Sequence, residues 1–229
     1  RLNNSLQETN RELSEFSHSV SHDLRAPLHT IQAFCELMKD EYAKVLNDSG
    51  NEYLSIIRKS ADRMNELIGD MLKLSKVTWA ELHRKKVNLS IIARDILNTL
   101  QENEPTRNVR LEIQKDVFAN GDPGLLKIVM ENLLNNSWKF TRKKDDALIV
   151  FGVDFKEGSA IYRVCDNGAG FDMKFKERLF QPFHRLHSES EFEGTGIGLA
   201  TVYRIIKKHG GAIWAEGIKN KGATFYFTL

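Results

Sequence analysis

Apolar residues recur at steps of three, four and seven along the first third of the chain. In the first stretch these positions are Leu2, Leu6, Leu13, Phe16, Val20, Leu24, Ile31, Leu37 and Met38. Loop-forming residues at 47–50 interrupt the pattern, and it then resumes at Leu54, Ile57, Ala61, Met64, Ile68 and Met71. Such spacing is typical of helices that pack together along a seam. We predict an antiparallel helical hairpin over residues 1–79. One hairpin cannot bury both seams, so we also expect a homodimeric four-helix bundle.

From about Val87 the pattern changes to a mixture of helices and strands. Periodicity predicts helices at 91–100, 123–140 and 197–208, and strands at 109–113, 148–155, 161–165, 213–216 and 223–229. Asp122 and Pro123 are the N-cap and first-turn residues that commonly open a helix. Mixed elements of this kind indicate a domain of their own. The predicted fold class is therefore α plus α/β, with an α/β domain at 88–229 and a linker at 80–87.

Composition and charge exclude several classes of protein. The 33 basic and 31 acidic residues give a net charge of +2, with no basic stripe carrying interleaved aromatics, so no nucleic-acid partner is expected. Cys35 and Cys165 each stand alone, which argues against a zinc or dithiol site. No apolar run approaches the roughly 18–20 residues that cross a bilayer. The chain begins at Arg1 within a helical pattern, and we interpret it as a cytoplasmic piece of a longer protein.

Two histidines of the first predicted helix lie on its polar side. Counting by seven from His22 reaches only polar residues, and His18 also falls on a polar stripe, so exposure does not distinguish them. Only His22 is followed by a carboxylate, that of Asp23. A carboxylate can hold the proton on one imidazole nitrogen and stabilise the positive charge that grows when the other attacks. Pro27 has no N–H to bond the carbonyl of Asp23, so the helix is expected to bend or loosen there.

Amides and a lysine share one face of the helix predicted at 123–140. Asn132, Asn136 and Lys139 are spaced by four and three, which brings them together on that face, and Phe140 follows directly. An amide oxygen suits Mg²⁺, a hard cation that keeps several waters and bridges phosphates. This segment alone is also compatible with an ordinary polar helix face.

Glycine-rich segments follow later in the domain. Asp166-Asn167-Gly168-Ala169-Gly170 comes after a predicted strand, and its glycines allow a ligand to approach the backbone. Gly194-Thr195-Gly196-Ile197-Gly198-Leu199 opens a helix, where free N–H groups and the helix dipole favour an anion. The G-x-G-x-G spacing near the C-terminus differs from that of a dinucleotide fold. Two further segments are Phe180-Gln181-Pro182-Phe183-His184-Arg185-Leu186 and Lys221-Gly222-Ala223-Thr224-Phe225.

These segments, in this order and downstream of Ser21-His22-Asp23-Leu24-Arg25-Ala26-Pro27-Leu28, resemble the conserved boxes of sensor histidine kinases. The resemblance covers nearly the whole chain. It implies a sandwich-type nucleotide domain of the histidine-kinase, gyrase and Hsp90 kind that binds ATP and Mg²⁺. It further implies autophosphorylation of His22 with help from Asp23, transfer to a response-regulator receiver domain, and an upstream sensor domain.

The resemblance also assigns roles in the nucleotide site. Asn136 would hold Mg²⁺, Lys139 would contact phosphate, and Asp166 would accept a hydrogen bond from the adenine amino group. Segment 172–195 would form a lid over ATP. The remaining residues implied to contact the nucleotide are Asn132, Phe140, Gly168, Gly170, Arg185, Gly194, Thr195, Gly196, Gly198, Leu199 and Thr224.

Two alternative functions remain at this stage. Related ATPases carry a glutamate four residues before the Mg²⁺ asparagine to activate water, whereas this chain has Asn132, and an amide cannot take a proton. A non-catalytic dimeric scaffold would be expected to lack part of the motifs, and none is lacking. Relatives that dephosphorylate their regulator carry a threonine or asparagine four residues after the histidine. This chain has Ala26 there, so weak phosphatase activity is expected.

Overall fold

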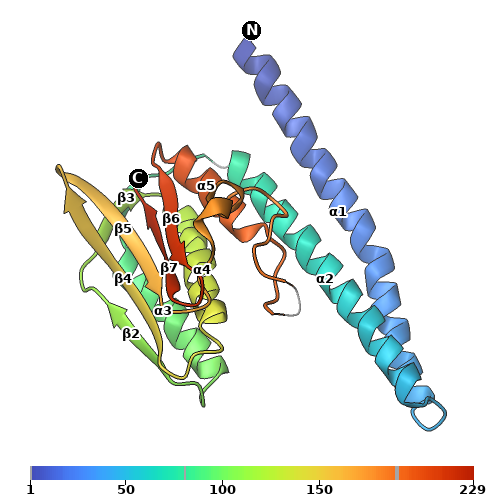
Figure 1. Cartoon of the computed structure of the whole chain (residues 1–229). Coiled ribbons are helices and arrows are strands. Elements are labelled where there is room, and N and C mark those ends of the chain that lie inside the picture. The colour runs from blue at the N-terminus through green and yellow to red at the C-terminus, as the bar shows by residue number, and fades with distance from the viewer. Residues whose placement is uncertain (1, 80, 189–190) are drawn as a thin grey trace. The chain divides into compact units, whose positions relative to one another are not determined.

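The structure, a computed structural model, describes residues 2–79, 81–188 and 191–229, without the side chains of residues 2–18, 22, 78 and 79. The chain divides into two compact units, Arg1–Trp79 and Ala80–Leu229 (Figure 1). The first is helical and the second combines helices with two sheets, as the fold-class prediction required. Within the described part of the chain, no helix combines the length and the apolar character needed to cross a bilayer.

The first unit is the predicted hairpin of two long helices. Helix α1 spans Leu2–Glu41 and continues through Pro27, and helix α2 spans Asp48–Trp79. The Asn47 side chain accepts a hydrogen bond from the Gly50 N–H (2.8 Å), which satisfies one of the free donors at the start of α2. Among the side chains of the hairpin that the structure describes, few apolar ones are buried. They are Leu28, Cys35, Ala61, Leu74 and Val77.

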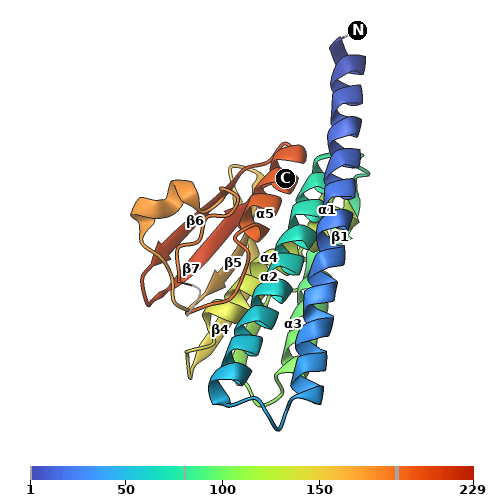
Figure 2. The ribbon, with the colours of Figure 1, turned by 90° about the vertical axis from the view of Figure 1, so that its right-hand side faces the viewer.

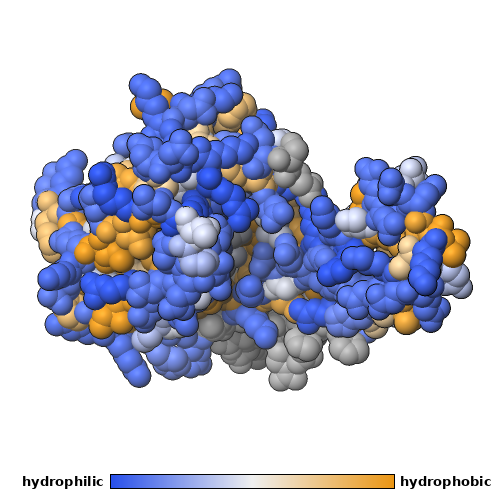
Figure 3. Space-filling view, turned by 90° about the horizontal axis from the view of Figure 1, so that it is seen from below, coloured by the Kyte–Doolittle hydropathy of each residue, from blue (hydrophilic) through white to orange (hydrophobic). Residues whose placement is uncertain are grey.

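The apolar seams of the hairpin remain largely open. On α2, Ile57, Met64 and Met71 are spaced by seven and are 46%, 45% and 54% exposed, whereas Ala61 is 1% exposed. A matching stripe on α1 comprises Val20, Leu24, Ile31, Phe34 and Met38. Figure 3 shows apolar side chains at the surface of the molecule. One hairpin therefore buries only part of the apolar pattern that the sequence carries.

The second unit is built on a five-stranded sheet of order β2-β4-β5-β7-β6. Its strands are β2 Val109–Ile113, β4 Ala147–Lys156, β5 Ser159–Asp166, β6 Ile213–Ile218 and β7 Gly222–Phe227. Strands β2 and β4 pair in parallel, and the other neighbours are antiparallel. Helices α3 (Leu89–Asn103), α4 (Pro123–Phe140) and α5 (Gly198–Lys208) lie together on one side of this sheet (Figure 2). A short 3₁₀ helix, η1, spans Met173–Arg178.

Helix starts in this unit follow the local sequence signals. The Asp122 carboxylate caps α4 by accepting hydrogen bonds from Gly124 N–H and Leu125 N–H, both 3.0 Å, as predicted for Asp122 and Pro123. Asn88 caps α3 in the same way through Ile91 N–H. Side chains from the sheet and all three helices form one dry core, because residues such as Phe151, Leu133 and Ile205 are 0–1% exposed.

A second, two-stranded sheet was not predicted. Strand β1 (Lys85–Asn88) pairs antiparallel with β3 (Phe118–Gly121). Residues 85–87, which we had placed in the linker, therefore belong to a paired strand of the second unit. Each strand has only four residues, with the sequences KKVN and FANG. Neither sequence is long enough to show the alternation of apolar and polar residues by which strands are recognised.

Candidate functional site

The proposed phosphoacceptor lies in the middle part of α1. His22 is part of that helix, but its side chain, like that of His18, lies outside the described residues. Asp23 is exposed directly beside it, and so is Ala26, which follows His22 by one helical turn. Ser21 is buried, at 5% exposure. The structure thus gives this part of α1 an accessible side around position 22.

Asp166 is the buried carboxylate of the second unit. It ends β5, is 5% exposed, and accepts hydrogen bonds from Ser137 O–H (3.1 Å) and Gly168 N–H (2.9 Å). Burial raises the pKa of Asp166 to about 6, partly offset by the hydrogen bonds from Gly168, Ser137 and the Ala223 backbone. Such a group is a buried acceptor of fixed orientation, which can accept a hydrogen bond from one donor of a ligand. Ser137 was not among the predicted site residues, although it lies on α4 beside them.

The two glycines after Asp166 are required by close backbone approach. A Cβ on Gly168 would lie 2.5 Å from the Phe140 carbonyl oxygen, and one on Gly170, where φ is +57°, would lie 2.0 Å from the Ile218 carbonyl oxygen. Ala169 N–H donates to that Phe140 carbonyl at 3.0 Å. The segment after β5 is therefore joined to the end of α4, with Gly168 and Ala169 against the Phe140 carbonyl.

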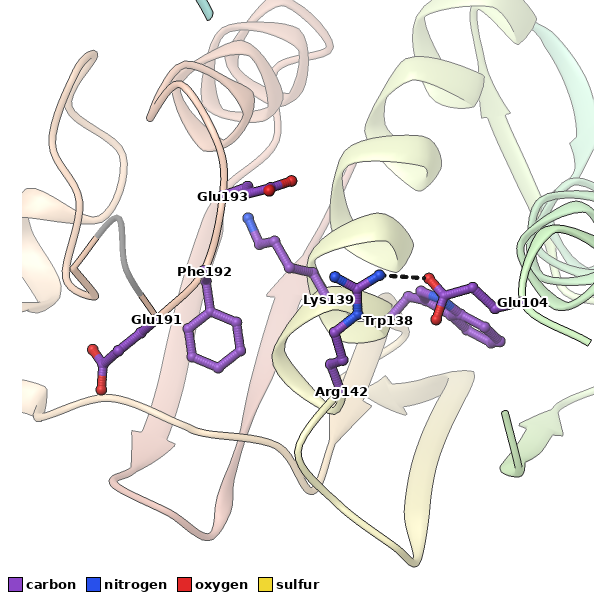
Figure 4. A pocket seen from close by; sticks show the side chains of 7 residues that line it. All are labelled: Glu104, Trp138, Lys139, Arg142, Glu191, Phe192 and Glu193. Atoms are coloured by element: carbon purple, nitrogen blue, oxygen red, sulfur yellow. Dashed lines mark hydrogen bonds and ion pairs between the residues drawn. The ribbon is translucent and has the colours of Figure 1, made fainter. Parts of the chain in front are cut away.

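Lys139 extends from α4 toward the loop before α5. In Figure 4 its ammonium group points toward Glu193, and a Cβ on Gly194 would lie 3.2 Å from Nζ. Burial and the nearby positive charge of Arg185 lower the pKa of Lys139 to about 8, against the opposing effect of Glu193. Burial and Arg185 thus outweigh Glu193, and an anionic ligand would stabilise the charged form of Lys139 further. Asn136, one turn earlier, is half-buried.

The glycine-rich loop meets α4 at Asn132. Helix α5 begins at Gly198, where a Cβ would lie 2.4 Å from Asn132 Oδ1, so only glycine fits against this amide. Gly194 and Gly196 have positive φ angles of 141° and 77°, the region that favours glycine. Thr195 Oγ1 accepts a hydrogen bond from Ile197 N–H (3.4 Å), and Leu199 lies half-buried in the first turn of α5. These predicted residues thus lie together at one helix start.

Two aromatic residues of the segment before α5 lie against Phe140. Phe192 makes an edge contact with Phe140 (5.0 Å between centroids), and His187 lies 5.2 Å from both rings. The His187 Nε2 atom is 2.9 Å from the Gly170 carbonyl oxygen, and Arg185 donates to the Phe192 carbonyl. Phe192 and His187 were not predicted, because no motif surrounds them. Arg185 was predicted for phosphate, and here it braces this aromatic cluster.

A cavity of about 390 Å³ opens beside the aromatic cluster (Figure 4). Its lining residues are Glu104, Trp138, Lys139, Arg142, Glu191, Phe192 and Glu193. Glu104 bonds Arg142 (3.0 Å) and Trp138 Nε1 (3.3 Å), and Arg107 stacks over the Trp138 ring at 4.4 Å. The cavity thus has one charged wall held rigidly by aromatic and ionic contacts, and Lys139 reaches into it.

The prediction for Thr224 needs a correction. In the sheet, Thr224 pairs with Cys165, while Ala223 pairs with Asp166. Because successive residues of a strand point to opposite faces, the side chain of Thr224 lies on the face away from Asp166, where it hydrogen-bonds Tyr226. Ala223 is the residue of β7 next to Asp166. The buried Phe225 and Phe227 share the face of Ala223. The alternation of residues along the strand therefore already indicated that Ala223, and not Thr224, faces the core.

The α/β domain thus combines a buried carboxylate, a partly buried lysine and a glycine-rich helix start, and it follows a helical hairpin that carries a histidine. Two family models match the chain. Residues 12–78 match the His Kinase A (phospho-acceptor) domain, and residues 121–229 match the histidine kinase-, DNA gyrase B-, and HSP90-like ATPase. Together the two matches cover more than half of the chain.

Relatives of known name are similar over the full chain. Phytochrome-like protein Cph1 of Synechocystis sp. is 30% identical and cyanobacterial phytochrome A of Nostoc sp. 33% identical, each covering 100% of this chain and 30% of the relative. Sensor protein kinase WalK of Staphylococcus aureus is 28% identical over 97% of this chain and 55% of its own length. The chain thus spans less than a third of the length of the phytochrome relatives.

Solved structures share the fold. Full-length ShkA in complex with AMPPNP has a TM-score of 0.65 at 23% identity, covering 93% of this chain and 45% of its own. The Acinetobacter baumannii histidine kinase AdeS has a TM-score of 0.61 at 17% identity, covering 90% of this chain and 96% of its own. With both family domains present in order, the chain belongs to the sensor histidine kinases, of which it carries the phosphoacceptor and ATPase-type domains.

Proposed function

We propose that this chain is the catalytic core of a histidine kinase that transfers the γ-phosphoryl group of ATP to its own His22. The observation that carries the proposal is the buried Asp166 carboxylate, which accepts hydrogen bonds from Ser137 O–H and Gly168 N–H. An ionised acceptor held in one orientation fits the amino group of adenine, which donates a hydrogen bond. The phosphoryl group would then pass from His22 to an aspartate of a response-regulator receiver domain.

The surroundings of Lys139 support binding of the phosphates. The charge of a partly buried lysine beside Arg185 is stabilised by an anion, and the free N–H groups and the helix dipole at the start of α5 favour an anion as well. Phosphoryl transfer needs mainly positioning and neutralisation of charge, which these groups supply. The kinase would work where ATP is available, which favours a cytoplasmic position for this core.

Asn136 is the residue we propose as the protein ligand of Mg²⁺. The described residues contain no cluster of three or more His, Cys, Asp or Glu side chains that could hold a metal by themselves. A single amide donor fits Mg²⁺ in a nucleotide site, because this ion keeps several waters and takes most other ligands from the phosphates. One amide oxygen on α4 is then sufficient. When bound, Mg²⁺ would neutralise charge on the β- and γ-phosphates.

Hydrolysis of ATP is the weaker alternative. The Asn132 amide is engaged, because its Nδ2 donates to the Ile128 carbonyl (2.8 Å) and its Oδ1 faces Gly198. Glu131, the neighbouring carboxylate, forms an ion pair with Lys127 at 3.8 Å. Neither side chain is arranged to take a proton from water, which favours transfer to a histidine over transfer to water.

A second hairpin is the partner we propose for residues 1–79. The open stripes at Ile57, Met64 and Met71 on α2 and at Leu24 and Ile31 on α1 repeat at the spacing of a helical bundle. A homodimer would cover these side chains on both copies. We further propose weak phosphatase activity, because Ala26 has no group with which to hold a water beside His22.

The fate of the γ-phosphate tests the proposal. The full chain is incubated with γ-labelled ATP and Mg²⁺. A kinase yields label on the protein that is lost in acid and kept in base, as expected for phosphohistidine. An ATPase yields free phosphate without labelled protein, and a scaffold yields neither. Label that survives acid, or free phosphate alone, would contradict the proposal.

A further inference from the structure

His209 is a buried histidine that takes no part in the proposed chemistry. It is the C-cap of α5 and is 2% exposed. Its Nδ1 lies 2.8 Å from the Ile205 carbonyl oxygen, and its Nε2 lies 3.0 Å from the Asp122 backbone N–H. Since a carbonyl only accepts and a backbone N–H only donates, the ring is neutral and carries its proton on Nδ1.

The two hydrogen bonds of His209 connect both helices that carry the nucleotide-site residues. Asp122 is the N-cap of α4, so the Nε2 bond ties the C-cap of α5 to the N-cap of α4. At the opposite end of α5, Gly198 lies against Asn132 of α4 with no room for a side chain. The two helices therefore run antiparallel, tied at one end and closely packed at the other. An axial shift of α5 would break the His209 bond or drive Gly198 into Asn132.

The imidazole ring of His209 is closely packed, with little room to move. A Cβ on Gly121 would lie 3.0 Å from His209 Nε2 and 2.8 Å from Leu126 Cδ1, so the ring lies directly on the backbone of β3. The first residues of the α/β unit also form hydrogen bonds with Asp122 and His209. The His83 N–H donates to the Asp122 carboxylate (3.1 Å), and the Arg84 guanidinium donates to the His209 carbonyl.

The charges around His209 keep the ring neutral. Burial lowers its pKa, and the positive charges of Arg84 and Lys208 act in the same direction against the opposing Asp122 carboxylate and the hydrogen bond to Ile205. A second ring proton would leave two N–H groups facing each other at Nε2. Neutrality is therefore a condition for the bond to Asp122.

We propose that His209 is a positioning residue for the nucleotide site. By holding α5 in register on α4, it sets where the loop from Gly194 to Gly198 stands relative to Asn132 and Asn136. This inference rests on the proposed function, because it takes those residues to bind Mg²⁺ and ATP. His209 itself lies at the far end of both helices and touches no ligand.

Three variants of the full chain separate positioning from general stability. His209→Leu removes both hydrogen bonds and keeps a buried apolar side chain. His209→Gln retains one donor and one acceptor and does not titrate. Ser90→Ala is the matched control, because Ser90 is 2% exposed and also bonds backbone twice, to Gln114 O (2.6 Å) and Val117 N (2.9 Å), away from α4 and α5.

The readouts are the Kd for Mg-ATP, the KM and kcat of autophosphorylation, and the melting temperature. We expect His209→Leu to raise the Kd and KM about tenfold or more, with a smaller change in kcat, because the misplaced loop weakens phosphate binding. His209→Gln should recover the Kd to within about threefold of the wild type. Ser90→Ala should lower the melting temperature and leave the Kd unchanged.

Wild-type affinity in folded His209→Leu would overturn the inference alone, as would a Ser90→Ala variant that loses as much affinity. A wild-type chain that does not bind Mg-ATP would overturn the proposed function as well. One measurement needs no variant. In the ¹⁵N spectrum of the wild-type histidine rings, His209 should show the neutral form protonated at Nδ1, and a signal for Nε2–H or for a doubly protonated ring would overturn the inference.

Discussion

The two units of the chain bury their apolar side chains to very different degrees. Of the side chains that the structure describes, the largest fully buried ones, such as Phe151, Met130 and Ile206, lie in the α/β unit. In the hairpin, the heptad positions Ile57, Met64 and Met71 are about half exposed. Burial of apolar surface is the main favourable term in folding. The α/β unit therefore carries its own core, whereas the hairpin leaves an apolar stripe uncovered, which the proposed homodimer would bury.

Function follows the same division. The α/β unit fixes Asp166, Ser137 and the surrounding backbone in a rigid arrangement, as a binding pocket requires. In the hairpin, Asp23 is exposed on one side of α1. A phosphoacceptor next to it would be accessible to a second domain. One unit is built to hold a small ligand and the other to offer a side chain. Changes in each should therefore act on different measurable properties.

The largest effect is expected from a charge in the open seam of the hairpin. Met64→Glu should weaken the dimer by more than about 100-fold, because an unpaired charge buried between two copies costs about 3–5 kcal/mol. Nucleotide affinity should not change. Analytical ultracentrifugation over a range of concentrations measures the dimer constant. The control is Lys59→Glu, which also adds negative charge to an exposed position of α2. Equal dimerisation of Met64→Glu and wild type would show that this stripe is not the interface.

The next largest effect concerns the buried carboxylate of the α/β unit. Asp166→Asn should weaken ATP binding by about 10–100-fold, the size expected when a hydrogen bond to a charged group is lost. The dimer should persist. Isothermal titration with a non-hydrolysable ATP analogue gives the affinity. The control is Asp154→Asn, which changes an exposed carboxylate of β4 that forms an ion pair with Arg163 of β5. ATP affinity unchanged by Asp166→Asn would remove Asp166 from the site.

The affinity for Mg-ATP should also depend on pH. Asp166 must be ionised to accept from adenine, and its pKa is raised to about 6, so affinity should rise as pH increases through 6. Lys139 must be charged, and its pKa is lowered to about 8, so affinity should fall as pH increases through 8. Each limb should reach at most about tenfold per pH unit. The lower limb should be absent from Asp166→Asn, and its persistence there would assign it to another group.

The smallest effect tests the correction made at β7. Thr224→Val should change ATP affinity by less than about twofold, because its side chain lies on the sheet face away from Asp166 and the shape is conserved. The same titration measures it, with Asp166→Asn as the positive control. A loss comparable to that of Asp166→Asn would mean that the Thr224 hydroxyl contributes to the pocket after all.

Much of the fold was accessible from local signals. The hairpin followed from heptad spacing, and α4 followed from Asp122 and Pro123. Strands β1 and β3 were missed because four-residue strands carry too little alternation, and their pairing joins residues 30 to 36 positions apart. Such pairings depend on the tertiary structure and leave no mark in a short window.

The candidate site was predictable where a motif fixed the residue and not where packing did. The motif residue Gly168 contacts both Asp166 and the Phe140 carbonyl, two other residues that the motifs had singled out. The hydrogen bond from Ser137 to Asp166 joins a helix to a strand, so no local pattern contains it. Thr224 is a different kind of error, since the two-residue period of the strand was present in the sequence and pointed to Ala223.

The central claim is that the phosphoryl group of ATP comes to rest on His22. The direct test is labelling of three full-length proteins with γ-labelled ATP: wild type, His22→Gln and His18→Gln. Each is checked first for unchanged affinity for an ATP analogue, so that loss of label reports the acceptor. The account predicts acid-labile label on wild type and on His18→Gln, and none on His22→Gln. Label that persists on His22→Gln, or that disappears from His18→Gln, would contradict it.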